Sequence, residues 1–190
     1  AIAFSERNDS IFRMDFTGLD LSKVAALQGG RVIPLEGRMS GDVDLTMAGT
    51  DHTTTSGTVN ADITATATDA ANGSMPINGN VRLSATNGLF NVDLAKLMTE
   101  RTELFATGRF DLRNVDSNLD VTLASTDASE VDRLFRVFGI SPEVEIRLDS
   151  MQAEFAGDLR ANVNITGNLS DPVIDGNASL ESLVLRGREV

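Results

Sequence analysis

The side chains that could perform acid–base or metal chemistry are few. His52 is the single histidine, and the chain contains no cysteine. A zinc site of the Cys/His type, a cysteine nucleophile, a redox pair and a disulfide are therefore excluded. His52 lies in a polar stretch, 49–54, that reads as a turn, and no nucleophile motif accompanies it. General-base catalysis needs such a partner, so we expect no catalytic role for His52.

Carboxylates occur in closely spaced pairs, but the spacing does not indicate a dedicated metal site. The pairs are Asp42/Asp44, Asp111/Asp116 and Glu143/Glu145. Two carboxylates spaced by two residues in a strand point to the same face, which could hold Ca²⁺ weakly. No calcium-loop pattern accompanies them, and no nucleophile-elbow, Walker or dinucleotide motif occurs. The sequence predicts a solvated face, with no enzymatic activity, no cofactor and no metal.

Composition narrows the class of protein further. The 190 residues contain 16 Lys and Arg against 28 Asp and Glu, which gives a net charge of −12, and they contain no Trp or Tyr. Nucleic-acid binding needs basic surface and stacking platforms, so it is not expected.

The chain is 41% hydrophobic, enough for a core, and its length fits one domain or two small ones. No apolar run approaches the roughly 20 residues of a membrane-spanning helix. The chain starts without Met, and we expect it to be a piece of a longer protein.

Period-two alternation dominates the chain. Apolar and polar residues alternate at 43–47, 59–68, 81–85, 110–112, 119–123, 144–148, 151–155 and 159–165. This period is typical of strands with one apolar and one polar face, and one-sided wetting favours antiparallel pairing. Polar residues with glycine at 49–51, 72–74 and 87–88 predict hairpin turns. The Asn78-Gly79 pair predicts a turn, or alternatively a bulge inside a longer strand.

Helical spacing appears in two segments, 20–28 and 125–139. The second carries a stripe of Val131, Leu134, Phe135 and Phe138, and Asp127 with Glu130 predicts a capping box at its start. We expect this stripe to close one end of the apolar face; control of ligand entry is the alternative. A third short helical turn is predicted at 94–98. Each main helix follows an alternating strand and precedes a proline, which indicates degenerate repeats at roughly 10–100 and 102–190.

The segment from Phe155 to Leu180 resembles the AsmA-like/TamB superfamily. Its pattern is an aromatic residue or Leu before Gly, an alternating strand, then Gly-x-Leu-x-x-Pro-x-x-x-Gly and a further strand. A partial copy without the proline element runs from Leu35 to Gly49. The resemblance implies a long periplasmic protein of a diderm bacterium, anchored in the inner membrane. In this family a curled β-sheet with an apolar interior is thought to carry phospholipid between the membranes, and some members act with an outer-membrane barrel protein.

The expected fold is therefore mainly β, a long, curled, mostly antiparallel sheet forming an apolar trough, with two or three short helices. Alternation by itself favours a two-layer sandwich or a closed barrel that buries the dry face on itself. An open trough would be a large apolar patch, which soluble proteins avoid unless they bind something. We predict that the trough is lined by Met39, Val43, Leu45, Met47, Val59, Ile63, Val81, Leu83, Phe110, Leu112, Leu119, Val121, Leu123, Ile146, Leu148, Phe155, Leu159, Val163 and Ile165.

Three functions follow as hypotheses. The first is a conduit for phospholipid acyl chains. The second is a scaffold that helps outer-membrane barrels to assemble by offering free β-edges. The third is a β-rich adhesin stalk, which would bury its dry face completely. The shape of the sheet, open or closed, discriminates between the first and the third.

Overall fold

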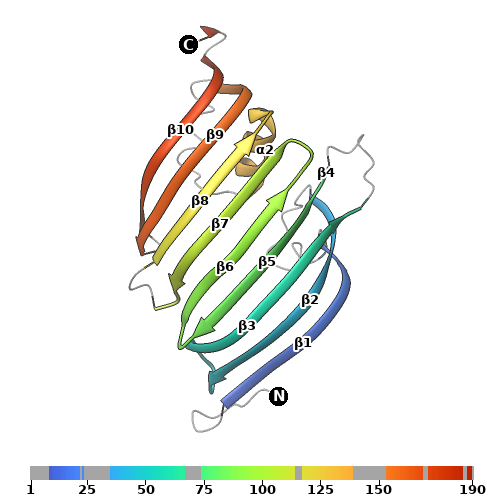
Figure 1. Cartoon of the computed structure of the whole chain (residues 1–190), viewed down its shortest axis with the longest axis vertical. Helices are drawn as coiled ribbons and strands as arrows, with labels where there is room; N and C mark the ends of the chain where they lie inside the picture. Colours follow the sequence, from blue (N-terminus) through green and yellow to red (C-terminus); the bar gives the residue numbers. More distant parts are fainter. Residues whose placement is uncertain are drawn as a thin grey trace.

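The chain forms a single layer of long strands (Figure 1). In a computed structural model, the described residues are 9–21, 23, 35–66, 74–113, 117–138, 153–168, 171–185 and 188–189. Ten strands lie side by side, each antiparallel to its neighbours, in the order β1-β2-β3-β5-β6-β7-β8-β9-β10-β11, and β4 pairs in parallel with β2. The sheet is open and slightly curled. The predicted mainly β fold with a long, mostly antiparallel sheet is confirmed.

The strands carry most of the described chain. Their bounds are β1 (Asp9–Asp20), β2 (Leu35–Ala48), β3 (Asp51–Ala65), β4 (Met75–Pro76), β5 (Asn78–Thr86), β6 (Leu89–Met98), β7 (Thr102–Asp111), β8 (Ser117–Ser125), β9 (Ala153–Asn168), β10 (Asp171–Leu185) and β11 (Arg188–Glu189). Helix α2 (Ala128–Phe138) follows β8.

Turn chemistry explains two of the hairpins. Asn87 and Gly88 join β5 to β6 with φ values of +48° and +79°, the left-handed pair that a tight hairpin requires. Gly49, with φ +56°, opens the turn between β2 and β3. Both turns lie where the sequence predicts them.

Two other local predictions are wrong. The segment 94–98 is not helical but belongs to β6, and Asn78-Gly79 is not a turn but begins β5. In β6 a bulge lies between Val92 and Ala95, so the apolar positions are spaced by three residues, as on a helix. The predicted helix at 125–139 is confirmed as α2. Of the predicted helix at 20–28, Asp20 ends β1, Leu21 and Lys23 are helical, and the rest lies outside the described residues.

A small core closes one end of the sheet. Strand β4 contributes Met75, and Ile77 directly after it donates its amide to the Glu36 carbonyl at 3.0 Å. Leu35, Met75 and Ile77 are buried, and partly buried apolar side chains pack against them from β3, β6, α2 and the residue after β1: Ile63, Leu97, Leu134 and Leu21. Helix α2 thus touches the sheet at this end.

Glycine allows close approach between strands. Gly57, inside β3, has φ +136°, and a Cβ there would overlap the Asp44 carbonyl oxygen of β2. Gly108 in β7 has φ +126°, and its Cβ would overlap the Asn118 carbonyl of β8. Glycine kinks of this kind permit a sheet to curl.

Gly57→Ala should therefore destabilise the fold strongly. The variant adds both the strain of a positive φ and an overlap with the β2 backbone, so we expect a loss of about 3 kcal/mol or more in urea unfolding. Gly167→Ala is the matched control, because Gly167 has φ +83° but open space around its Cβ position. It should lose only about 1–2 kcal/mol. Equal losses in the two variants would refute the overlap.

Candidate functional site

Cross-strand register aligns the apolar side chains into continuous rows. Residues directly opposite each other in antiparallel strands share a face, so the pairings can be followed from β1 to β10. The first row is Met14, Val43, Val59, Leu83, Val92, Gly108, Leu119, Ile165 and Ile174. The second row is Phe16, Gly41, Ala61, Val81, Ala95, Ala106, Val121, Val163 and Gly176. The third row is Leu19, Met39, Ile63, Gly79, Leu97, Leu104, Leu123, Ala161 and Ala178.

These apolar rows contain no polar side chain at any position on any of the nine strands they cross. Neighbouring strands lie about 4.8 Å apart, so each row is roughly 38 Å long. Alternate positions along one strand are about 6.7 Å apart, so the three rows together are about 13 Å wide between their outer lines. The surface is aliphatic apart from Phe16, and it offers no hydrogen-bond donor or acceptor from a side chain.

The opposite face is polar and carries the ion pairs. Arg13 on β1 pairs with Asp44 on β2 at 3.0 Å, and Arg82 on β5 pairs with Asp62 on β3 at 2.6 Å. Asp42 accepts a hydrogen bond from Asn60 at 3.0 Å. The predicted carboxylate pair Asp42/Asp44 therefore lies on the solvated face, engaged with side chains of neighbouring strands. Exposed pairs of this type add little stability but keep this face in water.

The apolar rows are only partly shielded. In the middle of the sheet, Ala61 and Val92 are 6% and 8% exposed, whereas Met14 on β1 is 39% exposed and Ile174 on β10 is 63% exposed. No second sheet covers this face within the described part of the chain. The sandwich and closed-barrel alternatives therefore do not hold for the described strands.

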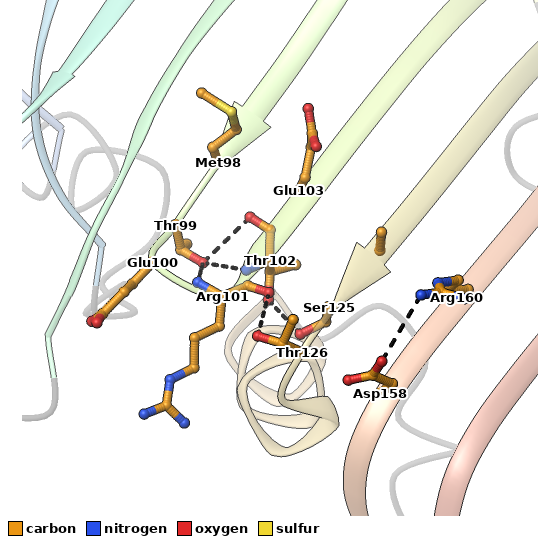
Figure 2. A pocket seen from close by; sticks show the side chains of 11 residues that line it. Met98, Thr99, Glu100, Arg101, Thr102, Glu103, Ser125, Thr126, Asp158 and Arg160 are labelled. Carbon is orange, nitrogen blue, oxygen red and sulfur yellow. Dashed lines mark hydrogen bonds and ion pairs between the residues drawn. The ribbon is translucent and has the colours of Figure 1, made fainter.

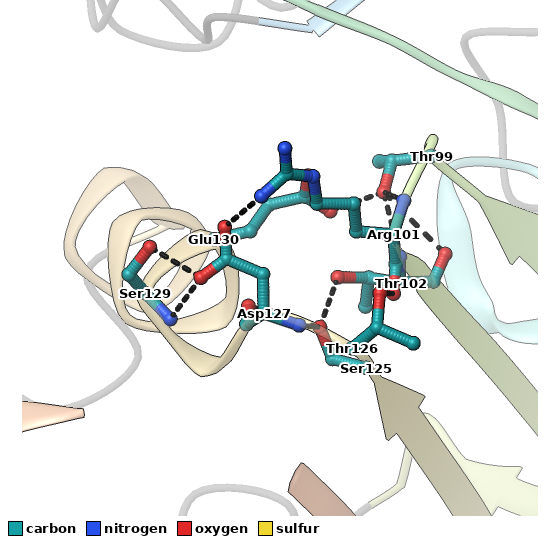
Figure 3. A network of polar contacts seen from close by, with 8 residues as sticks. All are labelled: Thr99, Arg101, Thr102, Ser125, Thr126, Asp127, Ser129 and Glu130. Carbon is teal, nitrogen blue, oxygen red and sulfur yellow. Dashed lines mark hydrogen bonds and ion pairs between the residues drawn. The ribbon is translucent and has the colours of Figure 1, made fainter. Parts of the chain in front are cut away.

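Helix α2 is attached by a polar network that lies beyond the third row, where β7 begins and β8 ends. Asp127 caps the helix, because its Oδ1 accepts hydrogen bonds from the Ser129 amide at 3.1 Å and the Ser129 hydroxyl at 2.6 Å (Figure 3). Its Oδ2 pairs with Arg101 in the β6–β7 turn at 2.8 Å. The Ser129 hydroxyl, the Ser129 amide and the Arg101 guanidinium hold the pKa of Asp127 below its ordinary value, and burial opposes them only partly.

The capping box is half confirmed. Asp127 is the N-cap, but Glu130 does not return a bond to the Asp127 amide, which instead donates a hydrogen bond to Ser125 Oγ at 3.1 Å. The Glu130 carboxylate, 6% exposed, accepts a hydrogen bond from the Thr99 hydroxyl in the β6–β7 turn. The residue predicted to cap the helix locally therefore ties α2 to the sheet.

Hollows in the surface lie on the polar side. One, of about 310 Å³, is lined by the β6–β7 turn, the end of β8 and part of β9 (Figure 2). Its walls include Glu103 and Arg160. Both residues pair with Ala124 on β8, one from each side, so all three lie in one cross-strand row on the polar face. Asp158 and Arg160 form an ion pair across 3.9 Å. This mixture of exposed charges and hydroxyls shows no nucleophile–base pair, and we assign it no chemistry.

The remaining titratable groups form no reactive cluster among the described residues. Asp111, at the end of β7, accepts bonds from the Arg113 guanidinium at 2.5 and 2.8 Å, and these lower the pKa of Asp111. His52 is exposed on β3. Among the described residues, no three His, Asp or Glu side chains gather as metal ligands. Asp116, Glu143 and Glu145 lie outside the described residues.

Most residues predicted to line the apolar face lie on it in the structure. Eleven positions of the rows were predicted: Met39, Val43, Val59, Ile63, Val81, Leu83, Leu119, Val121, Leu123, Val163 and Ile165. The same face carries Leu45 and Phe110, which flank the first row, Met47 beyond Leu45, and Leu159 beyond the third row. Whether these residues contact lipid stays a prediction.

The other four predicted residues are not placed on the apolar face. Ile146 and Leu148 lie outside the described residues, and Leu112 lies in the turn after β7. Phe155 pairs with Leu183, in the register of the polar face, because a bulge at Gly157 adds one residue to β9 and inverts the alternation. In the sequence, the only signal of this inversion is a glycine, Gly157, directly before the alternating run; in the structure it takes the left-handed φ of +75°.

Sequence reasoning missed the contribution of β1, β6, β7 and β10 to the rows. On β6 the bulge lies between Val92 and Ala95. The two residues are three positions apart, so a search for period-two alternation does not assign them to the same face. Phe90, which flanks the first row on the same strand, stacks on Phe110 with ring centroids 5.0 Å apart. On β1, the alternation of Phe12, Met14 and Phe16 predicts a strand, yet these residues were not assigned to the apolar face.

Comparison with protein-family models, curated proteins and solved structures found no match. Among the described residues, no helix is both long enough and apolar enough to cross a membrane.

The capping network predicts a pH-dependent stability. Because the folded-state pKa of Asp127 is lowered, its carboxylate stabilises the fold above the unfolded-state pKa of about 3.9, and this contribution is lost as pH falls through the lower folded-state value. Asp127→Asn keeps a capping oxygen but removes the charge. We expect it to lose at most about 1 kcal/mol at pH 7, since Arg101 is largely exposed.

Thermal unfolding at several pH values measures this loss. The difference between wild type and Asp127→Asn should shrink steadily as pH falls below about 4. A difference that is the same at pH 7 and pH 3 would show that the carboxylate charge does not contribute.

Proposed function

We propose that this chain is a segment of a periplasm-spanning protein that carries phospholipids between the inner and outer membranes of a diderm bacterium. The observation that carries the proposal is the set of three apolar rows, unbroken by a polar side chain across nine strands and partly open to solvent. The likeness of 155–180 to the AsmA-like/TamB superfamily supports it. The same likeness supports a periplasmic location and a parent protein anchored in the inner membrane.

The dimensions of the apolar rows suit hydrocarbon. A bilayer core about 30 Å thick implies acyl chains of about 15 Å each, shorter than the roughly 38 Å of a row. An acyl chain on this face would gain burial and dispersion contacts without breaking any hydrogen bond. The charged lipid headgroup would stay in water at the edge of the sheet. Because no polar side chain projects from the rows, this surface recognises the acyl chain of a lipid rather than its headgroup.

The openness of the sheet distinguishes this function from a structural stalk. A closed stalk would bury its apolar rows, whereas Ile174 and Met14 are among the most exposed large apolar side chains described. Large open apolar surfaces in soluble proteins generally mark a binding function.

A second candidate, a scaffold for assembly of outer-membrane barrels, rests on strand β10, whose outer side pairs with β11 only at Val184 and Leu185. Every residue from Val173 to Ser179 on this strand is exposed, and Val173, like Ile174, is 63% exposed. A strand of a barrel protein could pair with such an edge. Under this alternative, crosslinks from β10 would capture barrel strands and crosslinks from the apolar rows would capture no lipid.

Photo-crosslinking from the two faces of the sheet tests the lipid proposal. We would place benzoylphenylalanine at Val59 and Val163 in the apolar rows and, as matched controls, at Thr58 and Asn162, the preceding residues on the same strands. After incubation with vesicles of phosphatidylethanolamine and phosphatidylglycerol, mass spectrometry should find lipid adducts at Val59 and Val163 only. Equal labelling of both faces, or none, would overturn the proposal.

A charge placed in the second row should remove lipid binding without unfolding the sheet. Val163 is partly exposed, so Val163→Asp leaves its carboxylate in contact with water and should cost about 1–2 kcal/mol. In a closed core the same change would leave an unpaired buried charge and unfold the protein. We expect at least a tenfold loss of fluorescent-phospholipid transfer between vesicles, with the far-ultraviolet circular dichroism retained.

Asn162→Asp is the control for this substitution, because it adds the same charge one residue away on the polar face. It should transfer lipid like the wild type. Transfer that survives in Val163→Asp would argue against an acyl chain on the second row.

A further inference from the structure

The polar face of the sheet differs between its two halves. On β3 and β5 its side chains bind each other, as in the ion pair of Arg82 with Asp62 at 2.6 Å. On β9 and β10 the exposed side chains of Asn162, Asp175 and Asn177 are not bonded to any other side chain in the described part of the chain. Their donors and acceptors are therefore available to a ligand.

These side chains surround a hollow of about 370 Å³ over β8, β9 and β10. Its two walls are cross-strand rows of amide, carboxylate and hydroxyl side chains: Thr122, Asn162 and Asn177 in one, and Asp120, Asn164 and Asp175 in the other. The residues between the walls, such as Val163, belong to the second apolar row, so their side chains lie on the other face. The backbone of the sheet therefore forms the floor of the hollow.

An exposed aromatic ring continues the first of these walls onto β7, the strand next to β8 (Figure 1). Phe105 lies directly opposite Thr122, and Lys96 on β6 lies on its other side. The register therefore places Phe105 on the polar face, where it is 39% exposed. The small core at the end of the sheet does not include it. A flat apolar ring beside a row of amide and hydroxyl groups is a platform on which the C–H groups of a ligand can stack.

We propose that Phe105 and the two walls form a binding surface for a β-linked polysaccharide strand that lies across β7 to β10. Sugar rings present apolar C–H faces, which suit Phe105, and hydroxyl groups around their rims, which suit the walls. Amide side chains both donate and accept hydrogen bonds, and carboxylates accept them from hydroxyl groups. This surface lies opposite the apolar rows, so the inference goes beyond the proposed lipid function and does not rest on it.

Charge selects a glycan without acidic groups. Of the nine residues that line the hollow, two are carboxylates, Asp120 and Asp175, and none is basic. A phosphate or a uronic acid would be repelled here, because like charges raise the free energy of the complex. A neutral sugar meets no such repulsion, and its hydroxyl groups form charge-assisted hydrogen bonds with the carboxylates.

The spacing of the strands suits a chain of sugar rings. Neighbouring strands lie about 4.8 Å apart, so the rows extend for about 14 Å over the four strands from β7 to β10. A β-1,4-linked sugar advances its chain by a distance similar to one strand spacing. Successive rings can therefore meet equivalent side chains on successive strands, beginning with the ring stacked on Phe105.

One wall is partly organised before a ligand arrives. The Asn164 amide donates from Nδ2 to Asn118 Oδ1 and to Asp120 Oδ1, both at 2.8 Å. These bonds hold the Asn164 side chain in one orientation and leave Asp120 Oδ2 for a sugar hydroxyl. Most of the other wall side chains are exposed and must be ordered on binding, which costs conformational entropy. We therefore expect weak binding in fast exchange.

An NMR titration of the 190-residue chain tests the site. Cellotetraose and chitotetraose, each added up to about 10 mM, should shift amide signals of β7 to β10. Phe105→Ala should weaken binding about tenfold or more, because it removes the stacking platform, whereas Phe105→Tyr should retain binding. Ile11→Ala is the matched control. Ile11 is 36% exposed and shares the polar face through its pairing with Thr46 on β2, far from the hollow.

Substitutions in the walls test the hydrogen bonds separately from the ring. Asp175→Ala and Asn177→Ala should each weaken binding about threefold or more, since each removes acceptors that a sugar hydroxyl would use. Asp175→Asn keeps one acceptor and should restore part of the affinity. Thr58→Ala, on the polar face of β3, should bind like the wild type. Unchanged far-ultraviolet circular dichroism would show that each variant keeps the sheet.

Two results would overturn the proposal: no signal shift with either sugar at about 10 mM, or shifts that Phe105→Ala and Ile11→Ala reduce equally. Binding of either sugar that is lost in Phe105→Ala supports it, and the preferred sugar identifies the substituent at the second ring carbon. The titrations contain no lipid and the lipid assays contain no glycan, so each proposal has its own test.

Discussion

Register is the constraint on which the rest of this structure depends. The side-chain period of a strand is two, so a slip of one residue in any pairing would exchange the faces of the sheet from that strand onward. Here the register holds the same parity from Met14 on β1 to Ile174 on β10. Where β6 has one extra residue between Val92 and Ala95, the bulge absorbs it, and the strand returns to the correct face. The apolar rows exist because each local irregularity is compensated in this way.

A single layer with one apolar face must satisfy two opposing demands. The polar face is kept in water by exposed ion pairs, which contribute charge and solubility more than stability. Stability comes from the strand pairings and from the small core at one end, where Leu35, Met75 and Ile77 are buried. Helix α2 joins this end through Leu134 and is tied to the β6–β7 turn by Asp127 and Glu130. The end is closed by packing, while the rows beyond it remain partly exposed.

How much of the site was predictable depended on local regularity. Val43, Val59 and Val163 lie in clean alternating runs, and the structure places them in the rows as expected. The exceptions have a common cause in bulges. On β6 the bulge separates Val92 from Ala95 and imitates helical spacing, and on β9 the bulge at Gly157 moves Phe155 out of register with the rows. A bulge changes which residues share a face without changing the composition of the segment.

The sequence alone determines that this protein forms strands with one apolar and one polar face. Alternation is a property of neighbouring residues on one strand, so it can be recognised without knowledge of the rest of the fold. The tight turn at Asn87-Gly88 and the cap of α2 at Asp127 are local in the same sense. Only the tertiary structure decides that the sheet stays open, that three rows align across nine strands, and that Glu130 reaches Thr99. These features depend on hydrogen bonds and contacts between residues far apart in the chain, which the pattern within any one segment does not specify.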